Sequence, residues 1–442
     1  MEGLCPHRMP ERRLRGTPPG TIASRINGAA SRAPARGAAR GAMNTLPLLS
    51  AALPLLVAAA VVVSLSACGG STASDSSPGG AAGTASPSPT TGAAAAAVPA
   101  NAIWKVVGTG WKDPGSRFHA ITFADGDNGL AIGWTPDYRA AHVASTEDGG
   151  ATWAEATMGV HDQGMAASAI DSPLPGKVWG VGNLGYIATS PDNGMTWTYQ
   201  AEMTAGQDLN SVSFGDGDKG WAAGWQLNPT MKPAVYTAVM LHTDDGGASW
   251  KEQALGLPEE RAVKLWAVRF TDAANGWAVG AINDGPSGDP LSGQGLVCHT
   301  ADGGKTWEMK VAPGKTGLLG AVASIDDAHC WAVDGAGTVV STSDGGKSWG
   351  RSTTDKNAGV CYAIAFADAS NGWIAGQKTL LRTTDGGKTW AAEEAAATDE
   401  AFPADFTVYG LCCPGDGSVW ACGYAKTEGG PVRAAVWHRV AQ

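Results

Sequence analysis

The sequence predicts an all-β fold for most of this chain, and three observations support that prediction. The eight-residue motif S/T-x-D-x-G-x-T/S-W occurs six times between Thr146 and Trp390, at intervals of 41 to 57 residues. Ahead of most copies, a short apolar run, an Asp/Asn/Gly turn and a Trp-rich run such as ANGWAVG (Ala274–Gly280) form a β-hairpin pattern. No segment in this region has the apolar stripe of an amphipathic helix. A period of about 40 to 50 residues built from strands indicates a β-propeller.

Each repeat predicts one four-stranded blade. An inner strand leads through a hairpin to a second strand, a connection follows to a third, and the eight-residue motif turns the third strand into the fourth. In the motif, Gly permits the positive φ of a tight turn, and the Asp carboxylate can accept backbone N–H bonds. The closing Trp is expected to bury its ring between neighbouring sheets. We therefore predict structural roles for the Asp and Trp of every copy: Asp148, Trp153, Asp192, Trp197, Asp245, Trp250, Asp302, Trp307, Asp344, Trp349, Asp385 and Trp390.

The six motifs predict seven blades, because the last blade lacks a strand of its own. After Trp390 the chain offers three further strands, at Val408–Cys413, Ser418–Tyr424 and Arg433–Val440. The segment Ile103–Thr109 resembles the fourth strands but has no blade before it. The N-terminal strand should complete the seventh blade and so remove the open sheet edges.

The first 100 residues have a different composition. Residues 1–67 combine an Arg-rich segment with the uncharged apolar run Leu46–Leu65, which ends in LSAC (Leu65–Cys68). This layout resembles the signal peptide and lipobox of bacterial lipoproteins, with Cys68 as the lipidated N-terminus. A plain transmembrane anchor is the alternative. Residues 68–100 are rich in Gly, Ser, Ala and Pro and are expected to form a flexible tether; residues 101–442 are expected to form the propeller.

Charge and cysteine usage exclude several classes of function. The chain has a net charge of −10 and no basic patch in the propeller region, so nucleic-acid binding is not expected. Without a CxxC pair or a His-rich cluster, no metal or other cofactor is expected. Cys412 and Cys422 flank a short turn and could form a disulfide, or remain buried thiols. The same question is open for the other propeller cysteines: Cys298, Cys330, Cys361 and Cys413.

The motif resembles, position for position, the Asp box of bacterial neuraminidase (BNR) repeats, and we call it the Asp box below. NGWAVG-type hairpins that alternate with Asp boxes behind an export signal resemble the photosystem II stability/assembly factor family, over about Ala102–Gln442. The resemblance implies a seven-bladed, non-enzymatic propeller that holds partner polypeptides during complex assembly. It also implies that the Asp boxes lie at the blade edge, away from any binding site.

Loop lengths predict where partners bind. The turns between first and second strands are short, whereas the connections between second and third strands, and between blades, vary widely. In an up-and-down blade these two variable classes share one face, and variable loops on a rigid scaffold commonly bind ligands. We expect contacts there from Tyr138, Arg139, Tyr236, Arg261 and Asp284. Five inner-strand residues are expected to line the central mouth: His119, Asp208, Asn210, Tyr362 and Tyr409.

Together these patterns predict a lipid-anchored scaffold on the extracytoplasmic face of the cell membrane that binds envelope proteins without catalysis. The alternative is a carbohydrate-active propeller, either a sialidase-like glycoside hydrolase or a glycan-binding lectin. Against hydrolysis, the sequence singles out no arginine triad and no acid/base pair of carboxylates.

Overall fold

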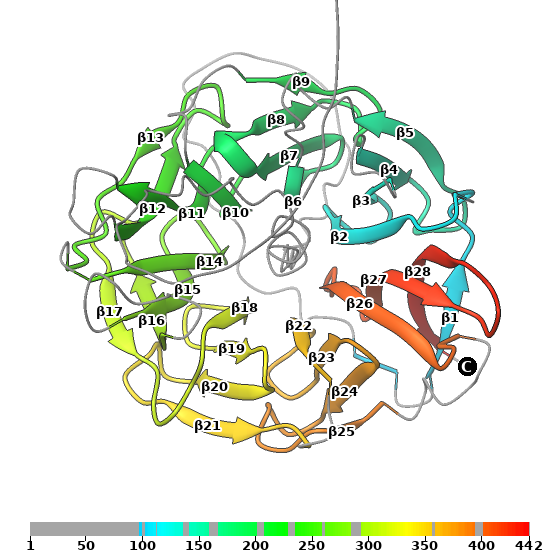
Figure 1. The fold of residues 1–442 in the computed structure, drawn as a ribbon. Coiled ribbons are helices and arrows are strands. Elements are labelled where there is room, and N and C mark those ends of the chain that lie inside the picture. The colour runs from blue at the N-terminus through cyan, green and yellow to red at the C-terminus, as the bar shows by residue number, and fades with distance from the viewer. Residues whose placement is uncertain are drawn as a thin grey trace, which may run out of the picture. The chain divides into compact units, whose positions relative to one another are not determined.

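The computed structural model describes residues 97–99, 102–111, 113–135, 141–158, 167–200, 207–228, 235–258, 261–283, 293–355, 359–393 and 401–441. This part of the chain forms seven four-stranded antiparallel sheets arranged as the blades of a ring (Figure 1). The prediction of a seven-bladed β-propeller is confirmed. The predicted signal peptide, Cys68 and most of the tether lie outside the described residues. The described part of the chain has no helix with the length and hydropathy of a membrane span.

The blades follow one another in chain order. The first four blades consist of β2 (Arg117–Phe123), β3 (Gly129–Trp134), β4 (Ala141–Thr146) and β5 (Ala154–Met158); β6 (Ala167–Leu174), β7 (Lys177–Gly182), β8 (Ile187–Ser190) and β9 (Thr198–Tyr199); β10 (Gln207–Phe214), β11 (Gly220–Asn228), β12 (Val235–Thr243) and β13 (Lys251–Glu252); and β14 (Val263–Phe270), β15 (Gly276–Ile282), β16 (Gln294–Thr300) and β17 (Glu308–Val311). A short 3-10 helix, η1 (Asn183–Gly185), joins β7 to β8.

The last three blades complete the ring. They consist of β18 (Leu319–Ser324), β19 (Cys330–Asp334), β20 (Thr338–Thr342) and β21 (Gly350–Thr353); β22 (Cys361–Phe366), β23 (Gly372–Gly376), β24 (Thr379–Thr383) and β25 (Ala391–Ala392); and β26 (Asp405–Cys412), β27 (Val419–Lys426), β28 (Val432–Ala441) and β1 (Ala102–Val107).

Each blade runs from an inner strand outward, so its turns fall on two ends of the ring. The Asp box joins the third strand to the fourth, and it lies beside the hairpin turn between the first two strands. The Gly246 amide donates to the Asp218 carbonyl at 2.7 Å, and the Gly386 amide donates to the Ser370 carbonyl at 2.9 Å. We call this side the box end. The opposite side carries the connections from second to third strands and from blade to blade, and we call it the loop end.

The N-terminal strand closes the ring, as the sequence predicts. Strand β1 pairs with β28 in antiparallel register from Ala102 opposite Ala441 to Val107 opposite Val436. The seventh blade therefore has the order β1-β28-β27-β26. The outer edge of β28 is covered, and the blade acquires a fourth strand without an Asp box.

A buried polar network replaces the missing box between the sixth and seventh blades. Glu393 follows β25 and accepts a hydrogen bond from Trp373 Nε1 at 2.6 Å. Its carboxylate lies 3.6 Å from Arg439 Nε, with side chains 3% and 1% exposed. Arg439 Nη1 also donates to the Pro99 carbonyl, which precedes β1. One guanidinium thus connects the last blade, the blade before it and the N-terminal segment.

Stacked aromatic rings hold most other blades together. Trp221 on β11 stacks on Phe270 of the next inner strand with ring centroids 3.4 Å apart. Trp331 on β19 stacks on Phe366 in the same way at 3.7 Å. The second glycine of the following box packs on the same kind of ring, because a Cβ on Gly247 would lie 2.2 Å from Trp179. Any larger residue at that box position would force neighbouring blades apart.

The box tryptophans lie at these seams but are less buried than the sequence predicts. Trp250 contacts Trp179 edge-on and is 8% exposed, whereas the other five box tryptophans are only partly buried. The most deeply buried indoles belong mainly to second strands, such as Trp221 and Trp277. The ring that the repeat pattern places between the blades is therefore chiefly the Trp of the hairpin.

The strand pairing answers the open question about the cysteines and shows one further local feature. Cys412 lies opposite Trp420, and Cys422 lies opposite Gly410, so the two thiols do not face each other across the hairpin. All six cysteines of the described propeller are buried free thiols. Between Trp225 and Tyr236 the chain is largely sheet, because β11 and β12 continue their pairing as far as Asn228 opposite Val235. This hairpin extends the third blade at its loop end.

Candidate functional site

At the box end, the Asp carboxylates of the boxes accept hydrogen bonds from within their own turns. In the fourth blade, Asp302 Oδ1 accepts hydrogen bonds from the Thr300 hydroxyl and the Thr306 amide, both at 2.9 Å. Its Oδ2 accepts the Thr306 hydroxyl at 2.7 Å. Hydrogen bonds from Ser348 lower the pKa of the equivalent Asp344 to about 2. A carboxylate satisfied in this way is a poor general base, so the geometry gives the box a structural role.

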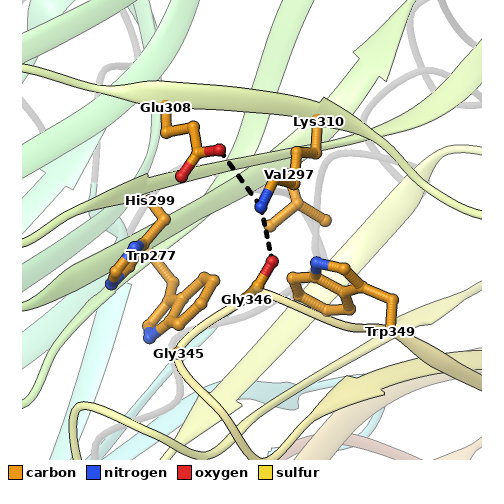
Figure 2. Close-up of a pocket in the computed structure, with 8 residues that line it drawn as sticks. All are labelled: Trp277, Val297, His299, Glu308, Lys310, Gly345, Gly346 and Trp349. Carbon is orange, nitrogen blue, oxygen red and sulfur yellow. Dashed lines mark hydrogen bonds and ion pairs between the residues drawn. The ribbon is translucent and has the colours of Figure 1, made fainter.

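A small pocket between the fourth and fifth blades is also structural (Figure 2). Lys310 on β17 extends across it, donates to the Gly346 carbonyl of the next box and pairs with Glu308 at 3.1 Å. Other outer-strand side chains make the same connection at other seams, including Gln200 to Gly247 and Ser352 to Gly387. The pocket is therefore one instance of a repeated link between blades.

The seven inner strands start at the loop end around the axis of the ring (Figure 1), and we call this place the channel mouth. Every inner strand has a register shift near its start, which leaves one residue bulged out of the ladder. Bulges re-aim side chains and often lie beside functional sites. The seven bulged residues are His119, Ser168, Asn210, Trp266, Gly320, Tyr362 and Tyr409.

The bulged residues divide the channel mouth into two parts. In the first three blades they are polar and tie successive inner strands together. His119 Nε2 bonds the Ala167 carbonyl at 3.2 Å, and Asn210 Nδ2 donates to the Leu265 carbonyl at 3.1 Å. Burial lowers the pKa of His119 to about 4, so the imidazole is neutral and donates through Nε2. From the fourth blade onward the bulged side chains are aromatic, apart from Gly320.

One cation at the mouth, between the third and fourth blades, is enclosed by aromatic rings. Lys264 Nζ lies 3.7 Å from the ring centroid of Trp225 and 3.8 Å from that of Tyr236. Lys264 is 4% exposed, and its charge acts on the neighbouring Asp208 carboxylate. Asp208 accepts the amide of Leu184, a half-exposed residue at φ 58. A non-glycine residue with such a positive φ has a strained backbone, and strain of this kind tends to be retained at functional sites.

A second cation lies where the seventh blade meets the first. Arg117, at the start of β2, has its guanidinium carbon 5.1 Å from the ring centroid of Tyr424. The same guanidinium donates a hydrogen bond to the hydroxyl of Tyr409. The Tyr409 ring lies 5.3 Å from that of Tyr362 and 6.1 Å from that of Tyr424. Burial raises the pKa of Tyr409 to about 12, so its hydroxyl stays protonated.

The predicted contact residues are only partly described. Tyr236 lies at the loop end of β12 against Lys264, and Arg261 lies just before β14, where its Nε donates to the Asn283 carbonyl at 3.0 Å. Tyr138, Arg139 and Asp284 lie outside the described residues. The binding role of all five stays a prediction.

Sequence reasoning placed four of the seven bulged residues at the mouth but did not pair them with Arg117, Lys264 or Tyr424. Arg117 and Lys264 each lie two residues before a bulged position, a recurrence that becomes visible once the inner strands are aligned. The described residues contain no group of three His, Cys, Asp or Glu side chains that could hold a metal ion.

The architecture defines a seven-bladed propeller whose loop end carries an aromatic channel mouth with two cations. No family model matches the chain. Over 131 residues it is 28% identical to the photosystem II assembly lipoprotein Ycf48 of Synechococcus sp. (strain CC9902), a match that covers 29% of this chain and 32% of the relative. The match thus spans about a third of the curated relative.

Solved structures agree on the fold. YCF48 bound to D1 peptide superimposes with a TM-score of 0.54 at 15% identity and covers 78% of this chain and 99% of that structure. YCF48 from Cyanidioschyzon merolae gives 0.51 at 17% identity, with 76% and 98% covered. A streptogramin B lyase gives 0.52 at 13% identity, with 77% and 98% covered. At these identities the likeness shows the fold alone, and the partial sequence match makes the chain similar to photosystem II assembly factors.

Proposed function

We propose that this chain is a non-catalytic scaffold that binds a partner polypeptide at the loop end of its propeller during assembly of a membrane complex. The observation that carries the proposal is the channel mouth, where aromatic side chains and two cations gather on rigid strands. The sequence match to Ycf48, and the fold shared with YCF48 bound to D1 peptide, support polypeptide as the class of ligand.

The loop end supplies the apolar contacts that a polypeptide needs. Leu184 and Leu227 expose 43% and 47% of their surfaces, and both belong to this end of the second and third blades. The partly buried rings of Trp225 and Tyr236 pack beside them on the extended hairpin. Aromatic and Arg side chains are enriched in the cores of protein interfaces, where apolar neighbours add to the buried contact.

The same proposal places the propeller at a membrane. Cys68, in LSAC, would carry the lipid, and the Gly/Ser/Pro-rich segment behind it would act as a tether on the extracytoplasmic side. More than one acyl chain is needed for stable anchoring, which lipoprotein processing supplies. Replacing Cys68 by Ser should release the protein or leave its precursor uncut. Unchanged processing and unchanged detergent partitioning would refute the anchor.

Site-specific photo-crosslinking tests the binding face. A benzophenone amino acid at Leu227 should crosslink a partner polypeptide, whereas the same group at Lys388, an exposed box-end residue, should not. Leu184→Asp, which introduces a residue that tolerates positive φ, should weaken the crosslink at position 227. Crosslinking only from position 388 would refute the proposed face. Hydrolysis of a glycoside by the purified protein would replace the scaffold with the carbohydrate-active alternative.

A further inference from the structure

Arg117 is an unusual cation within the described part of the chain. The chain carries a net charge of −10, yet no carboxylate of the described residues lies within ion-pair distance of this guanidinium. Two other cations have acidic partners, because Lys378 at the loop end lies 3.9 Å from Asp405, and Arg439 near the box end lies 3.6 Å from Glu393. Arg117 has instead the ring of Tyr424 and the hydroxyl of Tyr409.

The side chains around Arg117 exclude water from the guanidinium but supply no negative charge in its place. Arg117 is partly buried, and the rings of Tyr409 and Tyr424 take up part of its surface. A ring face stabilises a guanidinium by a modest amount, less than a paired carboxylate with good geometry does. Some of the five N–H donors of the guanidinium are left over after the single bond to Tyr409. The cation is therefore prepared for an anionic ligand that the described chain does not provide.

We propose that Arg117, with Tyr409 and Tyr424, forms a carboxylate-binding subsite at the channel mouth between the seventh and first blades. This inference rests on the proposed polypeptide-binding function and names the chemistry of the bound group. A planar carboxylate matches the guanidinium fork and can accept two parallel N–H bonds. The hydroxyls of Tyr409 and Tyr424 are the further donors of the cluster.

The rest of the cluster suits the residue that carries the carboxylate. Tyr362, stacked at a tilt on Tyr409, extends the aromatic surface toward Val360, which is 43% exposed. Beside it, Gly320 replaces a bulged side chain and leaves this part of the mouth free of a competing ring. An apolar side chain can pack on these groups while its carboxylate meets Arg117. The carboxylate can be a chain terminus or an Asp or Glu side chain.

Two small probes separate these sources. N-acetylleucine carries an α-carboxylate beside an apolar side chain, whereas N-acetylglutamic acid α-amide carries only a side-chain carboxylate. Each is titrated into the full-length protein, and binding is followed by NMR of the Arg117 Nε–Hε resonance. We expect saturable shifts with at least one probe and none with N-acetylleucine amide. If all three compounds bind equally, or if neither carboxylate binds, the inference is wrong.

Variants connect the shift to the subsite. Arg117→Met should weaken carboxylate binding, measured by calorimetry, at least tenfold, since it removes a charged hydrogen-bonding partner. Arg117→Lys keeps the charge but loses the fork, and it should also weaken binding. Tyr409→Phe should weaken it about threefold to tenfold, as expected for one lost hydrogen bond. Lys426→Met, an exposed cation at the loop end of the same β27, is the matched control and should leave binding unchanged.

Failure of this inference is distinct from failure of the proposed function. Should Arg117→Met, with an unchanged melting temperature, bind N-acetylleucine as the wild type does, the subsite is wrong even if Leu227 still crosslinks a partner. Should the wild type bind carboxylates through Arg117 while no partner crosslinks at Leu227, the polypeptide-binding function is wrong and the subsite stands as a small-anion site.

Discussion

Replacing Trp221 by Ala should be among the most damaging single changes at a blade seam. The indole is fully buried and stacks on Phe270 of the next blade with an interplanar angle of 4°. It also stacks on His242 of the paired strand β12, with ring centroids 4.8 Å apart. A buried Trp removes about 150–250 Å² from water, which corresponds to about 4–6 kcal/mol at about 25 cal/mol per Å². Mutational series give about 3–5 kcal/mol for such truncations. We expect a loss of about 4 kcal/mol in the free energy of unfolding.

The matched comparison is Trp307→Ala, at a box tryptophan that is only partly buried and meets Phe270 edge-on at 5.9 Å. Its cost should be smaller than that of Trp221→Ala, since less of its side chain is removed from water. Urea unfolding followed by far-UV circular dichroism measures both. Phe270→Ala, alone and combined with Trp221→Ala, gives the stacking energy as a coupling of about 0.5–1.5 kcal/mol. An equal or larger loss for Trp307→Ala would refute the assignment of the main seam ring to the hairpin Trp.

Three other predictions concern charge. Because hydrogen bonds lower the pKa of Asp344 to about 2, its contribution to stability is present above pH 4 and lost as the pH falls toward 2; Asp344→Asn should flatten the stability profile in that window. Burial lowers the pKa of His119 to about 4, so stability should fall as the pH drops from 6.5 to 4, and His119→Gln should remove this contribution, measured as melting temperature against pH. At the ring closure, Arg439→Met should cost about 3–5 kcal/mol by leaving Glu393 buried and unpaired. Combining it with Glu393→Gln should recover part of that loss, and no recovery in urea unfolding would argue against their coupling.

The parts of the fold that sequence predicts well are those encoded locally. An Asp box contains its whole turn within eight residues, and a hairpin such as Val263–Ile282 is set by its alternation and its turn residues, so blade number and strand order could be derived. The deep burial of Trp277 could not, because it depends on the box glycine and the Trp349 ring of the next blade. From the repeat pattern alone, the deeper burial is assigned to the Trp of the Asp box, because that Trp recurs at the most regular position.

In the candidate site, too, the features encoded within one strand were predictable, and those that depend on contacts between strands or blades were not. The mouth was predictable because inner strands must converge there, and Tyr362 and Tyr409 lie at their starts. The bulges were not, since a register shift such as that beside Tyr409 depends on how two strands pair rather than on one strand alone. Arg117 meets Tyr409 only because the ring brings the first blade back to the seventh.

The pairing of β1 with β28 also determines when this protein can finish folding. A chain that emerges N-terminus first contains β1 long before β28 exists, and the Arg439 bond to Pro99 spans 340 positions. Contacts of such long sequence separation form slowly and late, because the loop must close before the contact contributes. The first six blades can assemble from neighbouring hairpins, but the pairing of β1 in the seventh blade requires the ten-residue strand β28, which is made last. Until that strand is made, β1 is an unpaired segment, and the six completed blades present an open side.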